Sequence, residues 1–148
     1  EVKQNAALAG REGAVKFGLN GFVLARDTDQ EARDVLEEII AKANPDAVEG
    51  FRQAVQQAGA STRDKKGMWA DSTFRDLVQY NDGFRTGLVG TPERIAERIV
   101  EFKKRGVDLF LFGFLHYLDD IDYFGRNVLP IVRELEKDAV EAGELAHV

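Results

Sequence analysis

Three short apolar runs of this chain, at residues 17–25, 85–90 and 107–113, are each followed by a pattern typical of a helix. The third run is apolar at nearly every position, as expected for a parallel strand that is covered on both faces. Strands that alternate with helices indicate parallel strand pairs joined by right-handed crossovers. We therefore expect an α/β fold built on three parallel strands.

The helix after the first run is marked at both ends. Thr28 is a good N-cap, and Glu31 three residues later completes a capping-box pattern. Within residues 29–43 the apolar side chains recur at spacings of three and four, so that one helix face can pack on a sheet. Pro45 ends the helix, because proline has no N–H and disfavours helix in the residue before it.

The helix after the second run has the strongest start signal of the chain. Thr91 is suited to the N-cap and Pro92 to the first helical position, and cations at residues 103–105 suit the helix end. After the third run we expect a final helix over about residues 123–142, with a kink or break at Pro130.

The segment between the first helix and the second run does not fit a simple crossover. We expect helices at residues 46–57 and 73–80, separated by a mobile surface insertion at residues 59–67. Loops longer than about 12 to 15 residues are usually functional or disordered. This insertion is therefore a candidate for a functional segment.

Composition excludes several classes of function. The 20 Lys and Arg against 26 Asp and Glu give a formal net charge of -6, which leaves no basic surface for nucleic acid. Without cysteine and with 2 histidines, the chain cannot form disulfides, thiolate zinc sites or multi-histidine metal sites. No apolar run reaches the roughly 18 to 20 residues of a membrane span, and the first residues are not a signal peptide. We expect a cytoplasmic protein.

Parallel α/β folds carry their functional residues at the carboxyl ends of the strands. This rule selects residues 26–28, 90–92 and 113–116. His116 can serve as a hydrogen-bond donor or proton-transfer group beside a ligand, or it can be a surface histidine that starts the last helix. Residues 90–92 could present N–H groups to an anion, although capping alone explains them.

Two further features allow more than one interpretation. Trp69 could clamp a ring system, but aromatic burial favours its use as an anchor to the core. Asp119, Asp120 and Asp122 look like a metal cluster, yet the glycine and terminal glutamate of a calcium loop are missing. We interpret these three as a solvated helix start stabilised by the helix dipole, and we expect no metal site.

A family resemblance rests on five segments. They are Phe-Arg-Thr-Gly-Leu-Val-Gly-Thr-Pro-Glu-Arg and the residues after it at 84–99, Gly-Val-Asp-Leu-Phe-Leu-Phe-Gly-Phe at 106–114, and the shorter segments 17–23, 26–28 and 68–71. Together they resemble the C-terminal part of the bacterial-luciferase-like flavin monooxygenases. Within that family the chain most resembles the two-component, reduced-flavin-dependent dimethyl sulfone monooxygenases.

The resemblance implies a (β/α)8 TIM barrel that binds reduced FMN (FMNH2) at its carboxyl face. It also implies O2 as co-substrate, a partner NAD(P)H-dependent flavin reductase, and a homo-oligomer. Such a barrel needs about 200 to 250 residues. We therefore expect residues 1–148 to be the C-terminal portion, with the last three strands, their helices and the insertion at 59–67 as a lid over the flavin. The N-terminal strands carry most flavin contacts in the family.

Departures from the family point to the substrate. Relatives that oxidise alkanesulfonates have Arg and His where this chain has Asn20 and Phe22, and Arg and Tyr where we align Asn81 and Phe114. His116 keeps its family counterpart. Burying a sulfonate without a paired cation costs on the order of several kcal/mol of free energy, because the anion loses its water. The changes therefore favour a small neutral sulfone, cleaved at a C–S bond.

The resemblance also suggests residue roles. We expect His116 to be the catalytic residue, Trp69 to join the four positions above in binding the substrate, and Arg85 and Thr86 to bind the cofactor. Other functions stay open: an alkanesulfonate substrate, a deazaflavin cofactor, or a catalytically inert partial barrel that acts as an association module. Open sheet edges and an uncovered apolar face would favour the last.

Overall fold

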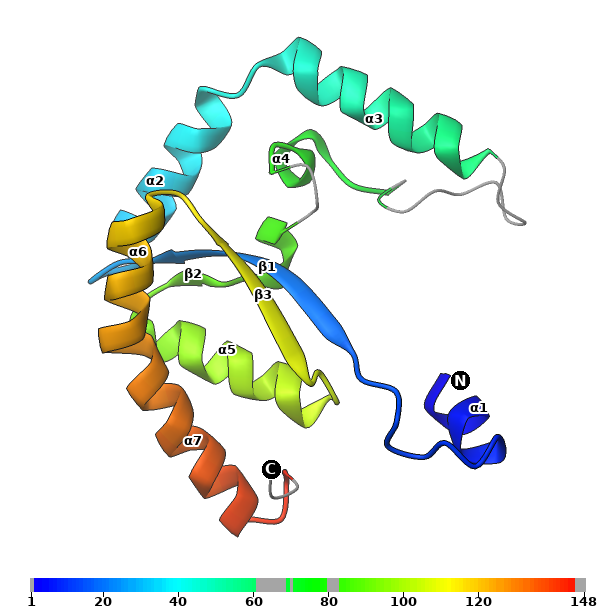
Figure 1. Cartoon of the computed structure of the whole chain (residues 1–148). Helices are drawn as coiled ribbons and strands as arrows, with labels where there is room; N and C mark the ends of the chain where they lie inside the picture. The colour runs from blue at the N-terminus through cyan, green and yellow to red at the C-terminus, as the bar shows by residue number, and fades with distance from the viewer. Residues whose placement is uncertain (1, 61–68, 70, 80–82, 146–148) are drawn as a thin grey trace.

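The computed structural model describes residues 2–60, 69, 71–79 and 83–145 of the chain (Figure 1). Its elements follow in the order α1 (Val2–Leu8), β1 (Gly18–Ala25), α2 (Asp29–Ala41), α3 (Pro45–Gly59), α4 (Phe74–Leu77), η1 (Gly83–Thr86), β2 (Val89–Gly90), α5 (Pro92–Lys104), β3 (Leu109–Phe114), α6 (Tyr117–Tyr123), η2 (Phe124–Val128) and α7 (Leu129–Glu141). The expected α/β fold with three parallel strands is confirmed.

The sheet has β1 at its centre, in the order β2-β1-β3. On one edge of β1, Leu24 pairs with Val89. On the other edge, β3 pairs with β1 in a register that includes Asn20 with Leu111. Successive strands of a TIM barrel are neighbours, so a barrel would place β2 in the middle. The three strands of the expected partial barrel are therefore present, in a different lateral order.

Helices cover both faces of this sheet. Val23 and Ala25 of β1 pack with α5, η2 and α7, whereas Phe22 and Leu24 pack with α2 on the opposite face. Figure 1 shows α5 and α7 below the sheet and α2 and α3 above it. A right-handed crossover places its helix on the other face when the chain turns toward the other edge. The doubly covered sheet follows from β2 and β3 lying on opposite sides of β1.

The face covered by α5 and α7 holds the larger core. Phe112 of β3 lies at its centre, with ring centroids 5.4 Å from Phe110 and 5.3 Å from Phe124. Leu88 and Ile95 are fully buried in the same cluster. Burial of one such side chain stabilises the fold by about 1.5–3 kcal/mol. This cluster is therefore the main source of stability for the described chain.

The face covered by α2 is only partly closed. Phe22, Leu24 and Leu36 are buried there, and Phe84 of η1 meets Phe22 edge-to-face at 5.2 Å. Farther along the same face Leu111 is 68% exposed, beside the exposed Asn20. An apolar strip of β3 thus remains open to solvent.

The second strand is shorter than expected. Instead of a strand over residues 85–90, residues Gly83–Thr86 form a 3-10 turn, and only Val89–Gly90 pair with β1. Gly87 lies between them at a φ of 73°, in the left-handed region that favours glycine. This reversal prevents a continuous extended segment.

The last helix begins earlier than expected and changes its form on the way. α6 starts at Tyr117 rather than near residue 123, and a π-helical turn, Phe124–Val128, separates it from α7. Pro130 is the second residue of α7 and has no N–H to donate four residues back. A π turn, whose hydrogen bonds span five residues, is compatible with the hydrogen bond that Pro130 cannot donate. The expected interruption at Pro130 is confirmed in that form.

The central segment contains both expected helices, but the second, expected over residues 73–80, already ends at Leu77. α3 covers Pro45–Gly59 and α4 covers Phe74–Leu77, the latter opened by a capping box of Thr73 and Asp76. Gly59 and Ala60 belong to the end of α3. The rest of the expected insertion, residues 61–67, lies outside the described residues, so its proposed mobility and lid role remain predictions.

Candidate active edge of the sheet

The loops after the three strands meet at the carboxyl edge of the sheet. After β1 come Arg26-Asp27-Thr28 and then Asp29, the first residue of α2, and their charged side chains bond to α6 and to the start of α5. Because parallel strands end at the same edge, loops far apart in the sequence are brought together here. We call this set of loop contacts the carboxyl-edge clasp, comprising Arg26, Asp27, Asp29, Asp120 and Tyr123.

The first contact of the clasp is an ion pair between Arg26 and Asp120. Arg26 Nη1 lies 3.0 Å from Asp120 Oδ1, with side-chain exposures of 23% and 10%, and also donates to the carbonyl of Ala25 at 2.6 Å. Asp120 was expected in a solvated acidic helix start, and that expectation is wrong for this residue. Its carboxylate turns inward because the loop after β1 offers a cation.

Asp120 also fixes the backbone at His116. The backbone N of His116 donates to Asp120 Oδ2 at 2.8 Å, which satisfies one N–H that the helix start leaves unpaired. His116 itself is the exposed N-cap of α6 and makes no side-chain capping bond. The imidazole therefore stands at the carboxyl edge, as predicted, on a backbone held by Asp120 and, through it, by Arg26.

A second contact joins the loop after β1 to α6. Tyr123 donates its hydroxyl to Asp27 Oδ1 at 2.6 Å. Burial, reinforced by this bond and the negative charge of Asp27, raises the pKa of Tyr123 to about 12. The phenol thus stays neutral and keeps donating throughout the physiological range.

The third contact fills the helix start that could have held an anion. Asp29 Oδ1 accepts from the backbone N of Thr91 at 3.3 Å, and Asp29 Oδ2 pairs with Arg94 at 3.1 Å. A Cβ on Gly90 would come within 2.5 Å of Asp29 Oδ1, so glycine makes room for this carboxylate. Thr91 caps α5 by accepting from the N–H of Arg94. The capping interpretation of residues 90–92 is confirmed.

The expected substrate residues do not share one pocket in this structure. Asn20 and Phe22 lie on the α2 face of β1, with Asn20 exposed and Phe22 buried against Phe84. Phe114 pairs in register with Val23 and packs on the opposite face, against the ring of Phe124 at 5.6 Å. The alternation of side chains along the strands separates them.

Trp69 packs against α3, and its role as a core anchor or as a substrate residue remains a prediction. Its ring is 5.7 Å from that of Phe51 on α3, and its φ of 63° places a non-glycine residue in the left-handed region. The contact with α3 favours an anchor for the segment before α4. Asn81, the remaining expected substrate residue, lies outside the described residues.

The expected cofactor residues occupy the turn before β2. Thr86 is buried, and its hydroxyl already donates to the carbonyl of Gly83 at 2.6 Å. The carbonyl of Thr86 accepts from Arg98 Nε at 3.0 Å. Arg85 is exposed on the same turn. The polar groups of Thr86 are thus engaged within the chain.

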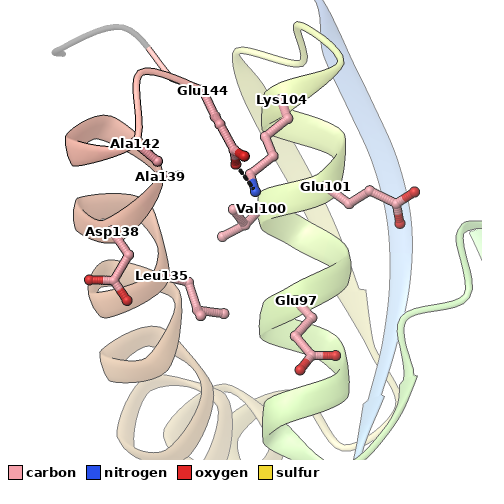
Figure 2. Close-up of a pocket in the computed structure, with 9 residues that line it drawn as sticks. All are labelled: Glu97, Val100, Glu101, Lys104, Leu135, Asp138, Ala139, Ala142 and Glu144. Carbon is pink, nitrogen blue, oxygen red and sulfur yellow. Dashed lines mark ion pairs between the residues drawn. The ribbon is translucent and has the colours of Figure 1, made fainter.

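Two cavities of the described chain lie away from the carboxyl edge. One of about 360 Å³ lies between α5 and α7 (Figure 2), and one of about 190 Å³ lies near Lys3, Lys16 and Asp108. Neither is lined by the expected site residues. Among the described residues no cluster of three acidic or histidine side chains is arranged to hold a metal ion. In that same part of the chain, every helix is too short or too polar to cross a membrane.

The sequence predicts only some residues of the carboxyl-edge clasp and none of its contacts. Residues 26–28 are predicted from their place after a strand, and the charge of Asp120 is evident in the sequence. No local pattern indicates that the side chains of Arg26 and Asp120, 94 positions apart, form an ion pair. An Arg directly after one strand and an Asp four residues beyond a strand-end histidine were the available signals.

Comparison with known proteins identifies the class to which this fold and edge belong. Residues 1–109 match the luciferase-like monooxygenase family. The match covers most of the chain, which therefore belongs to this family. The resemblance found in the sequence is confirmed.

Comparison with individual relatives shows how similar the chain is to particular members of the family. The chain is 59% identical over 138 residues to an FMNH2-dependent dimethylsulfone monooxygenase of Pseudomonas putida, and 56% identical over 137 residues to one of Pseudomonas fluorescens (strain Pf0-1). Each match covers 93% of this chain and 38% of the relative. A sulfoquinovose monooxygenase of Agrobacterium fabrum is 25% identical over 137 residues, covering 86% of this chain and 35% of that protein. The chain thus spans well under half the length of these relatives.

Proposed function

We propose that residues 1–148 are the C-terminal portion of an FMNH2- and O2-dependent monooxygenase that cleaves a C–S bond of dimethyl sulfone. The observation that carries this proposal is the 59% identity to a dimethylsulfone monooxygenase over 93% of the chain, against 25% to a sulfoquinovose monooxygenase. Family membership supports flavin chemistry. The contrast between the two identities supports a sulfone over a sulfonate.

The described residues do not form a flavin site by themselves. At the carboxyl edge, Arg26 is paired with Asp120, and the start of α5 is filled by Asp29. The hydroxyl of Thr86 is committed to Gly83. We therefore propose that strands outside residues 1–148 supply most flavin contacts, as the family resemblance implies.

The atoms and electrons of the proposed overall reaction balance. Insertion of one oxygen atom of O2 into a methyl C–H of dimethyl sulfone, followed by loss of the C–S bond, yields methanesulfinate and formaldehyde. The second oxygen atom leaves as water, and FMNH2 supplies the two electrons and becomes FMN. A reductase that uses NAD(P)H must then regenerate FMNH2, and we propose this reductase as the partner. We also propose that the intact protein is a cytoplasmic homo-oligomer.

Within this chain we propose that His116 orients a polar group of the substrate. Its support is the exposed imidazole on a backbone N–H held by Asp120. In the intact protein, His116→Asn should lower kcat about 100-fold, the lower end of the range for a positioned proton-transfer group. The matched control Leu118→Ala changes an exposed side chain of the same helix and should leave kcat unchanged. Equal effects of both variants would contradict the role of His116.

The proposed function is tested by a substrate comparison. The intact protein, supplied with FMNH2 and O2, should release sulfinate from dimethyl sulfone and leave an alkanesulfonate unchanged. Release of sulfite from the alkanesulfonate without turnover of the sulfone would overturn the substrate assignment. Replacement of FMNH2 by a reduced deazaflavin should abolish turnover, and retained turnover would overturn the cofactor assignment.

One observation favours a second candidate function. Leu109 and Leu111 are 65% and 68% exposed on the open face of the sheet, as expected for a chain that acts as an association module. In that case the 148-residue chain alone should self-associate, and Leu111→Glu should restore a monomer. A wild-type chain that sediments as a monomer would contradict this candidate.

A further inference from the structure

The larger cavity of the described chain is a groove between α5 and α7, open to solvent (Figure 2). Its volume is about 360 Å³, its floor consists of Val100, Leu135 and Ala139, and the exposed Ala142 lies on its wall. Val100 and Ala139 are buried and Leu135 is half-buried. We call this cavity the α5–α7 groove. Its small side chains leave room that neither helix fills.

The two walls repeat the same spacing. The residues that line the groove from α5 are at positions 97, 100, 101 and 104, and those from α7 are at positions 135, 138, 139 and 142. Each set follows the i, i+3, i+4, i+7 pattern of one helix face over two turns. Two such faces side by side form the kind of groove in which a third amphipathic helix lies.

The rim of the groove carries excess negative charge. Lys104 is paired with Glu144 across one end, and Glu101 is paired with Arg98 and Arg105. In the described part of the chain, Glu97 on α5 and Asp138 on α7 take part in no ion pair. Figure 2 shows Glu97 on α5 and Asp138 on α7, one on each helix that borders the groove. Each is exposed and can receive a cation from a guest without losing an existing partner.

We propose that the α5–α7 groove binds a basic amphipathic helix of another protein. Apolar side chains of that helix would pack on Val100, Leu135 and Ala139, and its Lys or Arg side chains would meet Glu97 and Asp138. The chain's own charge of -6 disfavours a second copy as the guest. The same acidic rim repels an anionic lipid surface. Charge complementarity therefore selects a cationic protein segment.

The groove is separate from the carboxyl-edge clasp. α5 starts at the carboxyl edge, next to Gly90, and the groove uses its residues up to Lys104 at the opposite end. None of the clasp residues lines the groove. A guest helix would therefore leave the candidate active edge free, and this inference does not depend on the proposed function.

The test uses a fluorescein-labelled peptide of about 14 residues, roughly four helical turns. It carries Leu at i, i+3, i+4 and i+7 and Lys at the flanking positions. A control peptide has the same composition, with the leucines spread around the helix. Fluorescence anisotropy with the 148-residue chain should show saturable binding of the first peptide and binding at least about tenfold weaker of the second, since only the first presents one apolar face.

Variants locate the binding site. Glu97→Lys and Asp138→Lys should each weaken binding about fivefold, because each replaces an attraction by a repulsion at the rim. Asp34→Lys, the same charge change on the exposed side of α2, should weaken it less than about twofold. Ala142→Trp fills the groove from its exposed wall and should abolish binding. Circular dichroism checks that each variant keeps its helices.

Three outcomes would overturn the proposal. Equal binding of both peptides would show a general attraction to an acidic chain. Equal weakening by Asp34→Lys and Asp138→Lys would show that the groove is not the site. A dimer of the chain that Ala142→Trp dissociates would show that a second copy occupies the groove.

Discussion

The two faces of the sheet differ in how completely they are closed. On the face of α5 and α7, Phe110, Phe112 and Phe114 of β3 are enclosed by aromatic and aliphatic partners. On the other face, Leu109 and Leu111 of the same strand are mostly exposed. The strand is equally apolar on both sides, so the difference lies in what covers it. A sequence that is apolar on both faces thus indicates two surfaces to be covered, and here α2 covers only the end near Phe22 and Leu24.

This difference is linked to the order of the strands. In a barrel of the family's kind, β2 would separate β1 from β3, and one face of all three strands would line the barrel interior. Here β3 pairs directly with β1, and α2 covers part of the face opposite α5. With three strands and no closure, right-handed crossovers to both edges of β1 bury apolar area on both faces.

A cross-link between β1 and β3 should give the largest effect. Asn20 and Leu111 are register partners with exposed side chains on the open face. The chain has no cysteine of its own, so Asn20→Cys with Leu111→Cys supplies the reacting pair. The resulting disulfide closes a long loop and should raise the free energy of unfolding by up to about 4 kcal/mol. Urea unfolding of the oxidised and reduced forms measures the difference.

The matched control for this cross-link is Gly18→Cys with Val89→Cys. Gly18 is the first residue of β1, whereas Val89 of β2 pairs with Leu24 near the other end of β1, so these two positions should not form a disulfide. Failure of the Asn20 and Leu111 pair to oxidise would mean that β1 and β3 are not neighbours in solution.

The contrast between the faces is tested directly by two adjacent residues of β3. Phe112→Ala removes a ring from the closed face and should lower the free energy of unfolding by about 3 kcal/mol. Leu111→Ala, one residue away on the open face, should change it by less than about 0.5 kcal/mol. Urea denaturation of both variants gives the comparison. Similar losses for the two would show that the open face is covered.

The clasp should contribute less than the aromatic core. Asp120→Asn leaves the partly buried Arg26 without its anionic partner and should cost about 2 kcal/mol, somewhat below the range for fully buried pairs. Asp119→Asn removes the same charge from an exposed position of the same helix and should cost at most about 0.5 kcal/mol. Thermal or urea unfolding distinguishes the two. Equal costs would mean that the Arg26–Asp120 pair adds nothing beyond helix-dipole effects.

The smallest expected effect is a pH dependence that arises from Tyr123. Its pKa in the folded chain is raised to about 12, from the ordinary 10.0. The stabilisation by the neutral phenol is therefore fully present below pH 10 and is lost as the pH rises toward 12. Unfolding measured between these values should show a steeper loss of stability for wild type than for Tyr123→Phe. Parallel curves would contradict the raised pKa of Tyr123 as the source of the pH dependence.

Much of the local structure could be predicted because its causes are local. Thr28 with Glu31 and Thr91 with Pro92 set two helix starts, and the structure has both capping arrangements. The spacing of apolar residues fixed which helix faces are buried, such as Ile95 and Ile99 on α5. Pro130 interrupts the last helix for a reason contained in one residue, its missing N–H. Each of these effects operates within a few positions of the chain.

The tertiary structure alone decided which strands are neighbours and which charges meet. Arg26 and Asp120 are 94 positions apart, and Asp120 is buried only because the loops after β1 and β3 end side by side. The same pairing placed Phe22 and Phe114 on opposite faces, which no local pattern could show. Local propensity acts through the backbone over one or two turns, whereas strand order is set by the burial of apolar area over the whole chain. The sequence by itself determined the starts of α2 and α5, the apolar helix faces and the family, and long-range packing determined the strand order and the edge that the strands form.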